Sequence, residues 1–334
     1  MIAKSRIFRH LLAAGVVAML STGAPALAQE TLRVAHTGNP GQSVYIYWDE
    51  LAKRVNERAG GKVKLQVHPS GQLGGDEQIF RSLKLGTLHM GSGSAANSGS
   101  MTDAYFWADL PYVFRSRDGA VKVFNDPEIS QYVNQKMRTD AGTVVLGYIE
   151  VGGFRVFANT KRQLKTPDDV KGLKFRALST PIDLGLLSAW QATPTPLAWS
   201  ESLPGMQQGV IEGIHLQPVW IKSAGFSEVL KHATVTRALM TFHVAQINAK
   251  TWDGLGPEVQ AVFRQAAQEA LKIANDADRA DEAKIVEDLK ARMTIYSPTP
   301  EELKRWEEAG RGIGPKFQDK IDRKVMDRVL AVQN

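Results

Sequence analysis

The spacing of apolar side chains changes repeatedly along the chain. Residues 31–36 (TLRVAH) alternate apolar and polar positions as a strand does, and residues 62–69 (KVKLQVHP) repeat that alternation. Between them, residues 44–61 carry apolar side chains three or four positions apart and end in two glycines, which predicts a helix. Residues 143–150 (TVVLGYIE) are a further predicted strand. Strands that alternate with helices favour a mostly parallel sheet with helices on both faces.

The same alternation resumes in the second half of the chain. Residues 173–178 (LKFRAL) predict a strand and residues 181–190 (PIDLGLLSAW) predict a helix. Residues 257–293 contain no glycine and no internal proline, which predicts one helix on the order of 55 Å long. A chain of 334 residues has room for two α/β domains. We therefore expect the long helix to brace both of them.

Two glycine-containing segments each have two interpretations. Gly152 and Gly153 separate two predicted strands, so they mark either a hinge or an ordinary β-bulge. Residues 90–100 (MGSGSAANSGS) follow a predicted strand and form either a flexible loop or a nest of backbone N–H groups that binds an anion. A flexible loop is the commoner outcome at this density of Gly and Ser, so we expect one here.

The first 28 residues have the pattern of a signal peptide. Lys4, Arg6 and Arg9 precede the apolar run LLAAGVVAML, and the segment APALA ends at Ala28. An apolar run of about ten residues is too short to serve as a membrane anchor, the alternative interpretation. The sequence therefore predicts cleavage after Ala28 and a mature protein in the periplasm.

Composition excludes several classes of function. The chain has no cysteine, which excludes disulfides, thiol nucleophiles and thiolate metal sites. Removing the three cations of the signal lowers the formal net charge from +6 to +3, which is too mild to indicate nucleic-acid binding. The histidines are scattered singly, so we expect no metal site and no cofactor. No nucleophile, base and oxyanion set is evident, which disfavours an enzyme.

The predicted strand around Arg176 carries two cations on one face. If residues 172–178 are extended, Lys174 and Arg176 point to one side and the apolar residues to the other. Open α/β sheets bind ligands outside the carboxyl ends of their strands, and Arg176 lies nearer that end. Lys174 lies further in, where its aliphatic stem allows the ammonium to reach water. From the pattern alone, Arg176 is equally an anion receptor or a structural ion-pair partner.

Four motifs in order resemble those of a known family. They are HPSGQLGGDEQIFRSLKLGTLHM (68–90), FWADLPYVF (106–114), GFRVFANTKRQLKTPDDVKGLKFRALSTP (153–181) and ATPTPLAWSESLPGMQQGVIEG (192–213). Together they resemble the periplasmic solute-binding proteins of tripartite ATP-independent periplasmic (TRAP) transporters. The resemblance covers the whole mature chain, and the third motif is its most diagnostic part.

The resemblance implies an α/β, two-lobed periplasmic-binding-protein-like fold with a ligand cleft between the lobes. We expect lobe I at 29–150 plus 242–280 and lobe II at 151–241 plus 281–334, with hinges near residues 150 and 242. Such a protein is not an enzyme: it captures a small organic acid and delivers it to membrane-embedded permease subunits driven by an ion gradient. The alternatives are a receptor of an ATP-driven importer and a secreted α/β enzyme that acts on carboxylates.

The resemblance also implies site residues. The Arg that ends the Gly-Leu-Lys-x-Arg strand takes the ligand carboxylate bidentately in the family, and Arg176 matches it. Arg155 matches a second Arg that often assists, and Trp199 follows the Pro-Thr-Pro block, where it would wall an apolar or aromatic part of the ligand unless it packs in the core. Further candidates are Ser94, Asn97, His215 and Gln217.

One departure from the family pattern bears on the ligand. Residues 214–218 read IHLQP, where many members have Gln-Glu-Asn-Pro, so the polar contacts usual there are not carried over. This departure favours an aromatic or partly apolar carboxylate. A dicarboxylate, a uronate and a 2-oxo acid remain open.

Overall fold

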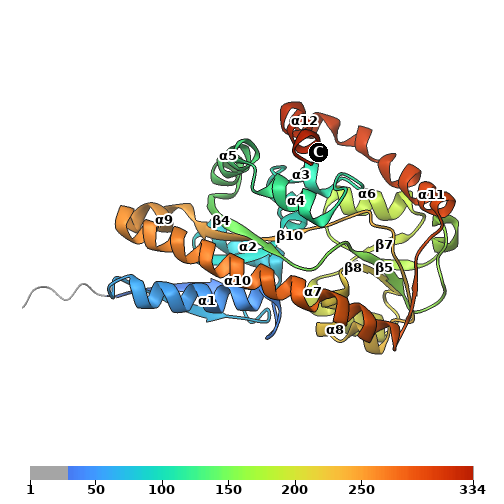
Figure 1. Ribbon diagram of the computed structural model, residues 1–334, viewed down its shortest axis with the longest axis horizontal. Helices are drawn as coiled ribbons and strands as arrows, with labels where there is room; N and C mark the ends of the chain where they lie inside the picture. Colours follow the sequence, from blue (N-terminus) through green and yellow to red (C-terminus); the bar gives the residue numbers. More distant parts are fainter. Residues whose placement is uncertain (1–28, 334) are drawn as a thin grey trace, which may run out of the picture.

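The computed structural model describes residues 29–333. These residues contain two β-sheets that lie side by side (Figure 1). The predicted signal peptide, residues 1–28, lies outside the described residues. None of the helices in the described part is long and apolar enough to cross a membrane. The two sheets and their flanking helices give the α/β fold that the alternating pattern predicts.

The first sheet is mainly parallel, with one strand that enters from far along the chain. β1 is parallel to both of its neighbours, whereas β10 is antiparallel to β3 and β4. Because β10 lies between β3 and β4, residues after 240 complete the sheet that the first 150 residues begin. In spatial order the strands are β2 (Val63–His68), β1 (Glu30–Ala35), β3 (Met90–Ser94), β10 (Phe242–Asn248) and β4 (Thr143–Glu150).

The second sheet has mixed directions. β5 is antiparallel to β8 and β9, while β6 is parallel to β7 and β8. The strand predicted at residues 172–178 is present as β6, and its exposure alternates between half-buried and buried as the pattern requires. In spatial order the strands are β11 (Thr294–Tyr296), β9 (His232–Thr234), β5 (Val156–Asn159), β8 (Gly213–Leu216), β6 (Lys174–Ala177) and β7 (Thr193–Pro196).

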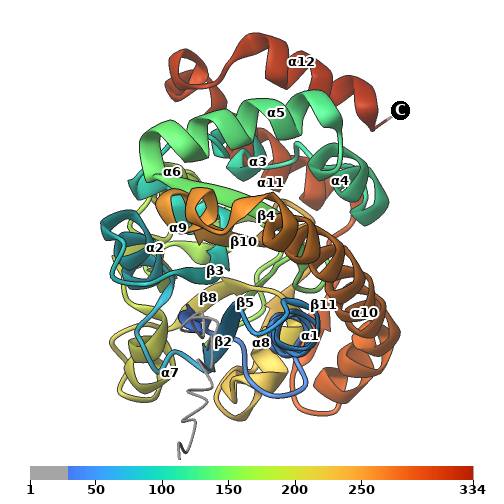
Figure 2. The same ribbon diagram turned by 90° about the vertical axis from the view of Figure 1, so that its left-hand side faces the viewer.

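Helices cover the sheets and join them. Around the first sheet lie α1 (Ser43–Arg58), α2 (Asp76–Leu85), α3 (Phe106–Asp109), α4 (Arg117–Phe124), α5 (Pro127–Lys136) and α9 (Ala249–Gly254). Around the second lie α6 (Pro181–Ala189), α7 (Trp199–Gln207), α8 (Pro218–Ser223) and α11 (Pro300–Arg311). Figure 2 shows α4, α5 and α12 (Arg323–Val332) together at one end of the molecule.

The long helix α10 spans Gly256–Lys290, 35 residues, close to the predicted range. It packs against α1 and β4 beside the first sheet and against α8 beside the second (Figure 1). Buried Ala266, Ala267 and Ala270 let neighbouring elements approach it closely. The expectation of a helix that braces both halves is confirmed.

The glycine pair at 152–153 lies in the crossover between the sheets, outside both ladders, so the β-bulge alternative is wrong. Gly152 has φ +91°, and a Cβ there would lie 2.9 Å from Val219 Cγ1. Its N–H donates to Asp278 Oδ2 of α10 at 2.8 Å. The crossover is therefore anchored to the long helix, and a hinge at this position stays a proposal.

The C-terminal helix requires a change in the proposed lobes. We expected residues 281–334 in lobe II, but Val325 and Val329 of α12 are buried together with Ile129 and Val133 of α5. An apolar helix face goes where a matching surface is available, and that surface belongs to the first sheet's helices. We therefore propose that α12 belongs to lobe I, and the other bounds also stay a proposal.

Candidate functional site

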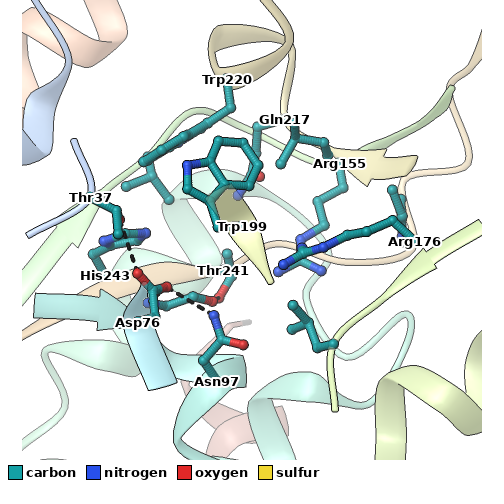
Figure 3. Close-up of a pocket in the computed structure, with 15 residues that line it drawn as sticks. Thr37, Asp76, Asn97, Arg155, Arg176, Trp199, Gln217, Trp220, Thr241 and His243 are labelled. Carbon is teal, nitrogen blue, oxygen red and sulfur yellow. Dashed lines mark hydrogen bonds between the residues drawn. The ribbon is translucent and has the colours of Figure 1, made fainter. Parts of the chain in front are cut away.

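A small cavity lies between the two sheets and is lined from both sides (Figure 3). Its volume is about 50 Å³, enough for roughly four water-sized groups. All seven residues predicted as ligand contacts line it, although they come from five separate stretches of the chain. The lining comprises Thr37, Asp76, Ser94, Asn97, Val151, Arg155, Arg176, Leu178, Trp199, His215, Leu216, Gln217, Trp220, Thr241 and His243.

Arg176 offers its guanidinium to the cavity. It lies in β6, whose alternate residue Phe175 is fully buried in the core. Arg176 Nε donates to Leu197 O at 3.1 Å, which leaves the two terminal nitrogens facing the cavity. Burial lowers the pKa of Arg176 from its ordinary value, and the group remains a cation because that value lies so high. Within residues 29–333 no carboxylate lies within 4.0 Å of its guanidinium nitrogens, so the structure gives no support to the ion-pair alternative, which the sequence left equal.

Arg155 lies beside Arg176, and the two guanidinium groups converge (Figure 3). We call Arg155 and Arg176 the arginine wall. Arg155 is only 7% exposed and its Nε has no partner among the described residues. Its Nη1 lies 3.9 Å from Asp183 Oδ1, beyond hydrogen-bond distance, and the other Asp183 oxygen accepts from Leu178 N at 2.7 Å. Two neighbouring guanidinium groups with one carboxylate at 3.9 Å have the donors and charge that suit an anion.

Asp76, the first residue of α2, faces the arginine wall from the other side of the cavity (Figure 3). Thr37 Oγ1 donates to its Oδ1, and both Ser94 N and Asn97 Nδ2 donate to its Oδ2, each at 2.9 Å. We call Thr37, Asp76 and Asn97 the Asp76 wall. Sequence reasoning missed Asp76 and Thr37. Their only signal was the position of Asp76 at a helix N-terminus, where carboxylates are common for other reasons.

The glycine-rich run at 90–100 is not a flexible loop, so that expectation is wrong. Its first half is β3 and its second half is a buried 3₁₀-helix, Ala95–Ser100. The glycines permit close packing instead: a Cβ on Gly93 would lie 2.9 Å from Asp76 Cβ. Ser94 Oγ and Thr241 Oγ1 are 3.2 Å apart and share a hydrogen bond across the cavity floor. The run thus holds Ser94 and Asn97 rigidly against Asp76.

Aromatic rings form a third side of the cavity. Trp199 meets Trp220 edge to face at 5.3 Å, and Trp220 stacks on His243 at 5.4 Å. Trp199 also packs against Phe226, so it both lines the cavity and belongs to the core edge. The structure therefore joins the two alternatives considered for this residue. The sequence did not indicate that Trp220 and His243 line the cavity, because α8 and β10 come together only in the folded chain.

His215 and Gln217 line the cavity from β8 and the residue before α8. His215 is buried, and burial holds its pKa well below its ordinary value, so the ring is neutral. Neither ring nitrogen has a partner among the described residues. A neutral imidazole has one N–H donor and one acceptor, and the backbone of Arg155 lies close enough to this ring to oppose part of the pKa shift.

A wider compartment adjoins the cavity. It has a volume of about 580 Å³, lies between α2 and the segment from β7 to α7, and shares Asp76, Arg176 and Trp199 with the cavity. Glu77, in the first turn of α2, lines this outer compartment and not the inner cavity. The outer compartment borders the arginine wall through Arg176.

The described residues contain no cluster of three or more His, Cys, Asp or Glu side chains suited to a metal ion. The cavity is lined by two neighbouring guanidinium groups, one hydrogen-bonded carboxylate, imidazole rings and indole rings. This set suits reversible binding of a small anion with polar substituents.

Comparison with known proteins agrees with this geometry. Residues 34–320 match the family described as bacterial extracellular solute-binding protein, family 7 (DctP). The chain belongs to this family. As a DctP-family member it is a solute-binding protein and not an enzyme, and its two-lobed α/β fold is that of TRAP periplasmic solute-binding proteins.

Individual relatives cover almost the whole chain. A solute-binding protein of Verminephrobacter eiseniae is 29% identical, with 98% of this chain and 97% of the relative aligned. A TRAP solute-binding protein from Sulfurospirillum deleyianum, solved with bound succinate, is 28% identical with a TM-score of 0.84, covering 91% of this chain and 99% of that one. One from Polaromonas, solved with D-erythronate, is 26% identical with a TM-score of 0.83, covering 91% and 98%.

Proposed function

We propose that this DctP-family protein captures a small organic acid in the cavity between its sheets and delivers it to a TRAP permease. The observation that supports this most is the arginine wall, two converging guanidinium groups without an ion-paired carboxylate at hydrogen-bond distance. Both solved relatives named above hold acids that carry a carboxylate. The ligand of this chain is then a carboxylate as well.

Arg176 is the principal carboxylate contact in this proposal. Its Nε is held by Leu197 O, so the terminal edge of the fork is already oriented and loses little freedom on binding. Charge-assisted hydrogen bonds to a carboxylate are about twice as strong as neutral ones. Arg155 assists from the adjacent position, and Gln217, His215 and Ser94 supply neutral polar contacts.

The aromatic side of the cavity supports a ligand that is in part apolar. Trp199, Trp220 and Leu178 line the space beside the arginine wall. Contact with indole rings stabilises carbon segments of a ligand and excludes water from the carboxylate contacts. This agrees with the partly apolar acid favoured by the IHLQP segment, whereas the small inner volume disfavours a large aromatic acid.

Delivery requires export and closure. We propose that the chain is cleaved after Ala28 and acts in the periplasm, where it presents the bound acid to the permease. The two lobes close about the crossovers near residues 150 and 242, because the ligand contacts both walls only in the closed form. Gln42 Nε2 donates to Ser223 Oγ at 2.6 Å, and this contact joins α8 to the turn before α1 across the proposed lobes.

A thermal-shift screen of the mature chain against small organic acids tests the proposal. A ligand that binds the folded chain raises its stability by RT ln(1 + [L]/Kd), so a binding acid raises the melting temperature. Uncharged alcohols of the same size are expected to have no effect. A screen in which no carboxylate raises the melting temperature would contradict the proposal.

Substitution of Arg176 tests the contact itself. Arg176→Lys keeps the charge but removes the planar fork, and we expect it to weaken binding of the best acid more than about tenfold, or about 1.4 kcal/mol. Lys174→Ala is the matched control, because Lys174 lies two residues earlier on the same strand face and donates to Gly209 O outside the cavity. Calorimetry showing equal affinity for wild type and Arg176→Lys would remove Arg176 from the site.

A further inference from the structure

The Asp76 wall is unusual in a cavity that receives an acid, because it places a carboxylate opposite the arginines. Asp76 accepts three hydrogen bonds, from Thr37 Oγ1, Ser94 N and Asn97 Nδ2. All three donors are neutral, so none of them cancels the negative charge. No cation lies within ion-pair distance of Asp76 among residues 29–333, although its charge opposes the effect of burial on the pKa of Arg176 and of His243.

These hydrogen bonds use up the donors that the first lobe would otherwise offer a ligand. The hydroxyl hydrogen of Thr37 points to Asp76, which leaves the Thr37 oxygen as an acceptor. The amide nitrogen of Asn97 is held by Asp76, so its carbonyl oxygen is turned toward the cavity (Figure 3). Asp76 itself keeps unused lone pairs on Oδ1. The Asp76 wall therefore presents oxygens that accept hydrogen bonds.

The two walls are therefore suited to bind chemically different ends of one ligand. The arginine wall accepts a carboxylate, and the Asp76 wall accepts a group that donates hydrogen bonds and carries no negative charge. A second ligand carboxylate at this wall would meet the Asp76 charge and three acceptor oxygens with few free donors. Like charges brought together in a desolvated site cost several kcal/mol.

We infer that Asp76 is a specificity determinant that selects a hydroxy monocarboxylic acid and rejects the dicarboxylate of the same chain length. This inference rests on the proposed function and adds to it the chemical class of the ligand. The ligand's carboxylate binds Arg176 and Arg155, its carbon chain lies along Trp199, and its hydroxyl donates to Asp76.

Two probes of equal chain length test the inference on the unmodified mature protein. Succinate and 4-hydroxybutanoate share four carbons and one carboxylate, and differ only in whether the far end is a carboxylate or a hydroxyl. We expect calorimetry to give a Kd for 4-hydroxybutanoate at least about tenfold lower than for succinate, a conservative bound for one like-charge contact. Equal binding, or tighter binding of succinate, overturns the inference.

Asp76→Asn tests the residue responsible. Asparagine keeps the shape and can still accept from Ser94 N and Asn97 Nδ2, while its own amide group adds donors in place of the charge. We expect the ratio of the two affinities to shift at least about tenfold toward succinate. Glu57→Gln is the control: it removes one exposed carboxylate on α1 that lines neither the cavity nor the outer compartment, and it should leave the ratio unchanged.

The outcomes separate this inference from the proposed function. If both probes bind and Arg176→Lys weakens both, but Asp76→Asn leaves their ratio unchanged, the receptor function stands and the role of Asp76 is wrong. If neither probe nor any other carboxylate binds, the proposed function itself fails. Because the wild-type ratio is measured first, the test holds even if Asp76→Asn does not fold.

Discussion

The arginine wall and the Asp76 wall face each other across one cavity, but they rest on different supports. Arg176 and Arg155 lie on or beside strands of the second sheet, directly above a core in which Phe157 stacks on Phe175 at 3.9 Å. Asp76 sits at the start of a helix and is positioned by hydrogen bonds from two other segments. One wall is set by strand alternation, and the other by contacts between distant parts of the chain.

The largest expected effect concerns the core under the arginine wall. Phe157 is fully buried and also contacts Trp190 and Trp306, so Phe157→Ala leaves a cavity and should lower the free energy of unfolding by about 3–5 kcal/mol. Urea denaturation measures this change. Leu85→Ala, at a residue 71% exposed, is the control and should change stability by less than about 0.5 kcal/mol. A loss below about 1 kcal/mol for Phe157→Ala would show that this aromatic stack contributes little to folding stability.

The next effect concerns the second arginine. Arg155→Met keeps the length of the side chain and removes the charge, and we expect it to weaken carboxylate binding by about 1.5–3 kcal/mol. The loss should be smaller than for Arg176→Met, because nearby Asp183 already offsets part of the Arg155 charge. Calorimetry on both variants measures the order, and the reverse order would make Arg155 the principal contact.

The position of Arg176 in the site could be predicted from the sequence, because it depends on neighbouring residues of the same strand. Alternation along residues 172–178 fixed which side chains share a face with Arg176, and the family motifs then indicated its partner. Both depend on neighbours in the chain. The long helix was predictable for the same reason, because helical spacing without a glycine is a local property.

The parts that sequence missed depend on distant segments. The run at 90–100 appears flexible by composition, yet it is buried because β10 pairs with β3 from about 150 residues away. Asp76 gains its role only when Thr37 and Asn97 come to its side. The packing of α12 on α5 could not be predicted from the sequence either, because an apolar helix face does not indicate which surface it packs against.

A pH-dependent effect on folding stability is expected behind the Asp76 wall. His36 precedes Thr37, is fully buried, and burial together with His243 lowers its pKa to about 3. Below pH 6.5 the unfolded chain takes up a proton at His36 while the folded chain does not, so folding stability falls as the pH drops from 6.5 toward 3. The contribution is at most about 1.4 kcal/mol per pH unit.

His36→Phe checks this contribution, since phenylalanine fills the same space and does not titrate. Urea denaturation between pH 7 and pH 4 should show a shallower loss of stability in the variant than in the wild type. Identical pH profiles would mean that His36 is not responsible for the acid sensitivity.

The smallest effect concerns Thr37. Thr37→Val keeps the shape and removes the hydroxyl that donates to Asp76, one neutral donor among three. We expect binding of 4-hydroxybutanoate to weaken by about 0.5–1.5 kcal/mol, with no change in the contribution of Arg176. Additivity of Thr37→Val and Arg176→Lys in calorimetry would agree with two independent walls, whereas strong coupling would show that they act as one unit.

The arginine wall is proposed to hold a carboxylate, and a comparison of an acid with its amide tests this most directly. The acid with the largest thermal shift and its primary amide have nearly the same shape and differ in charge. Calorimetry on the wild-type mature chain should show the amide binding at least about tenfold more weakly, because it loses the charge-assisted bonds to Arg176 and Arg155. An amide that binds as tightly as the acid would contradict the account.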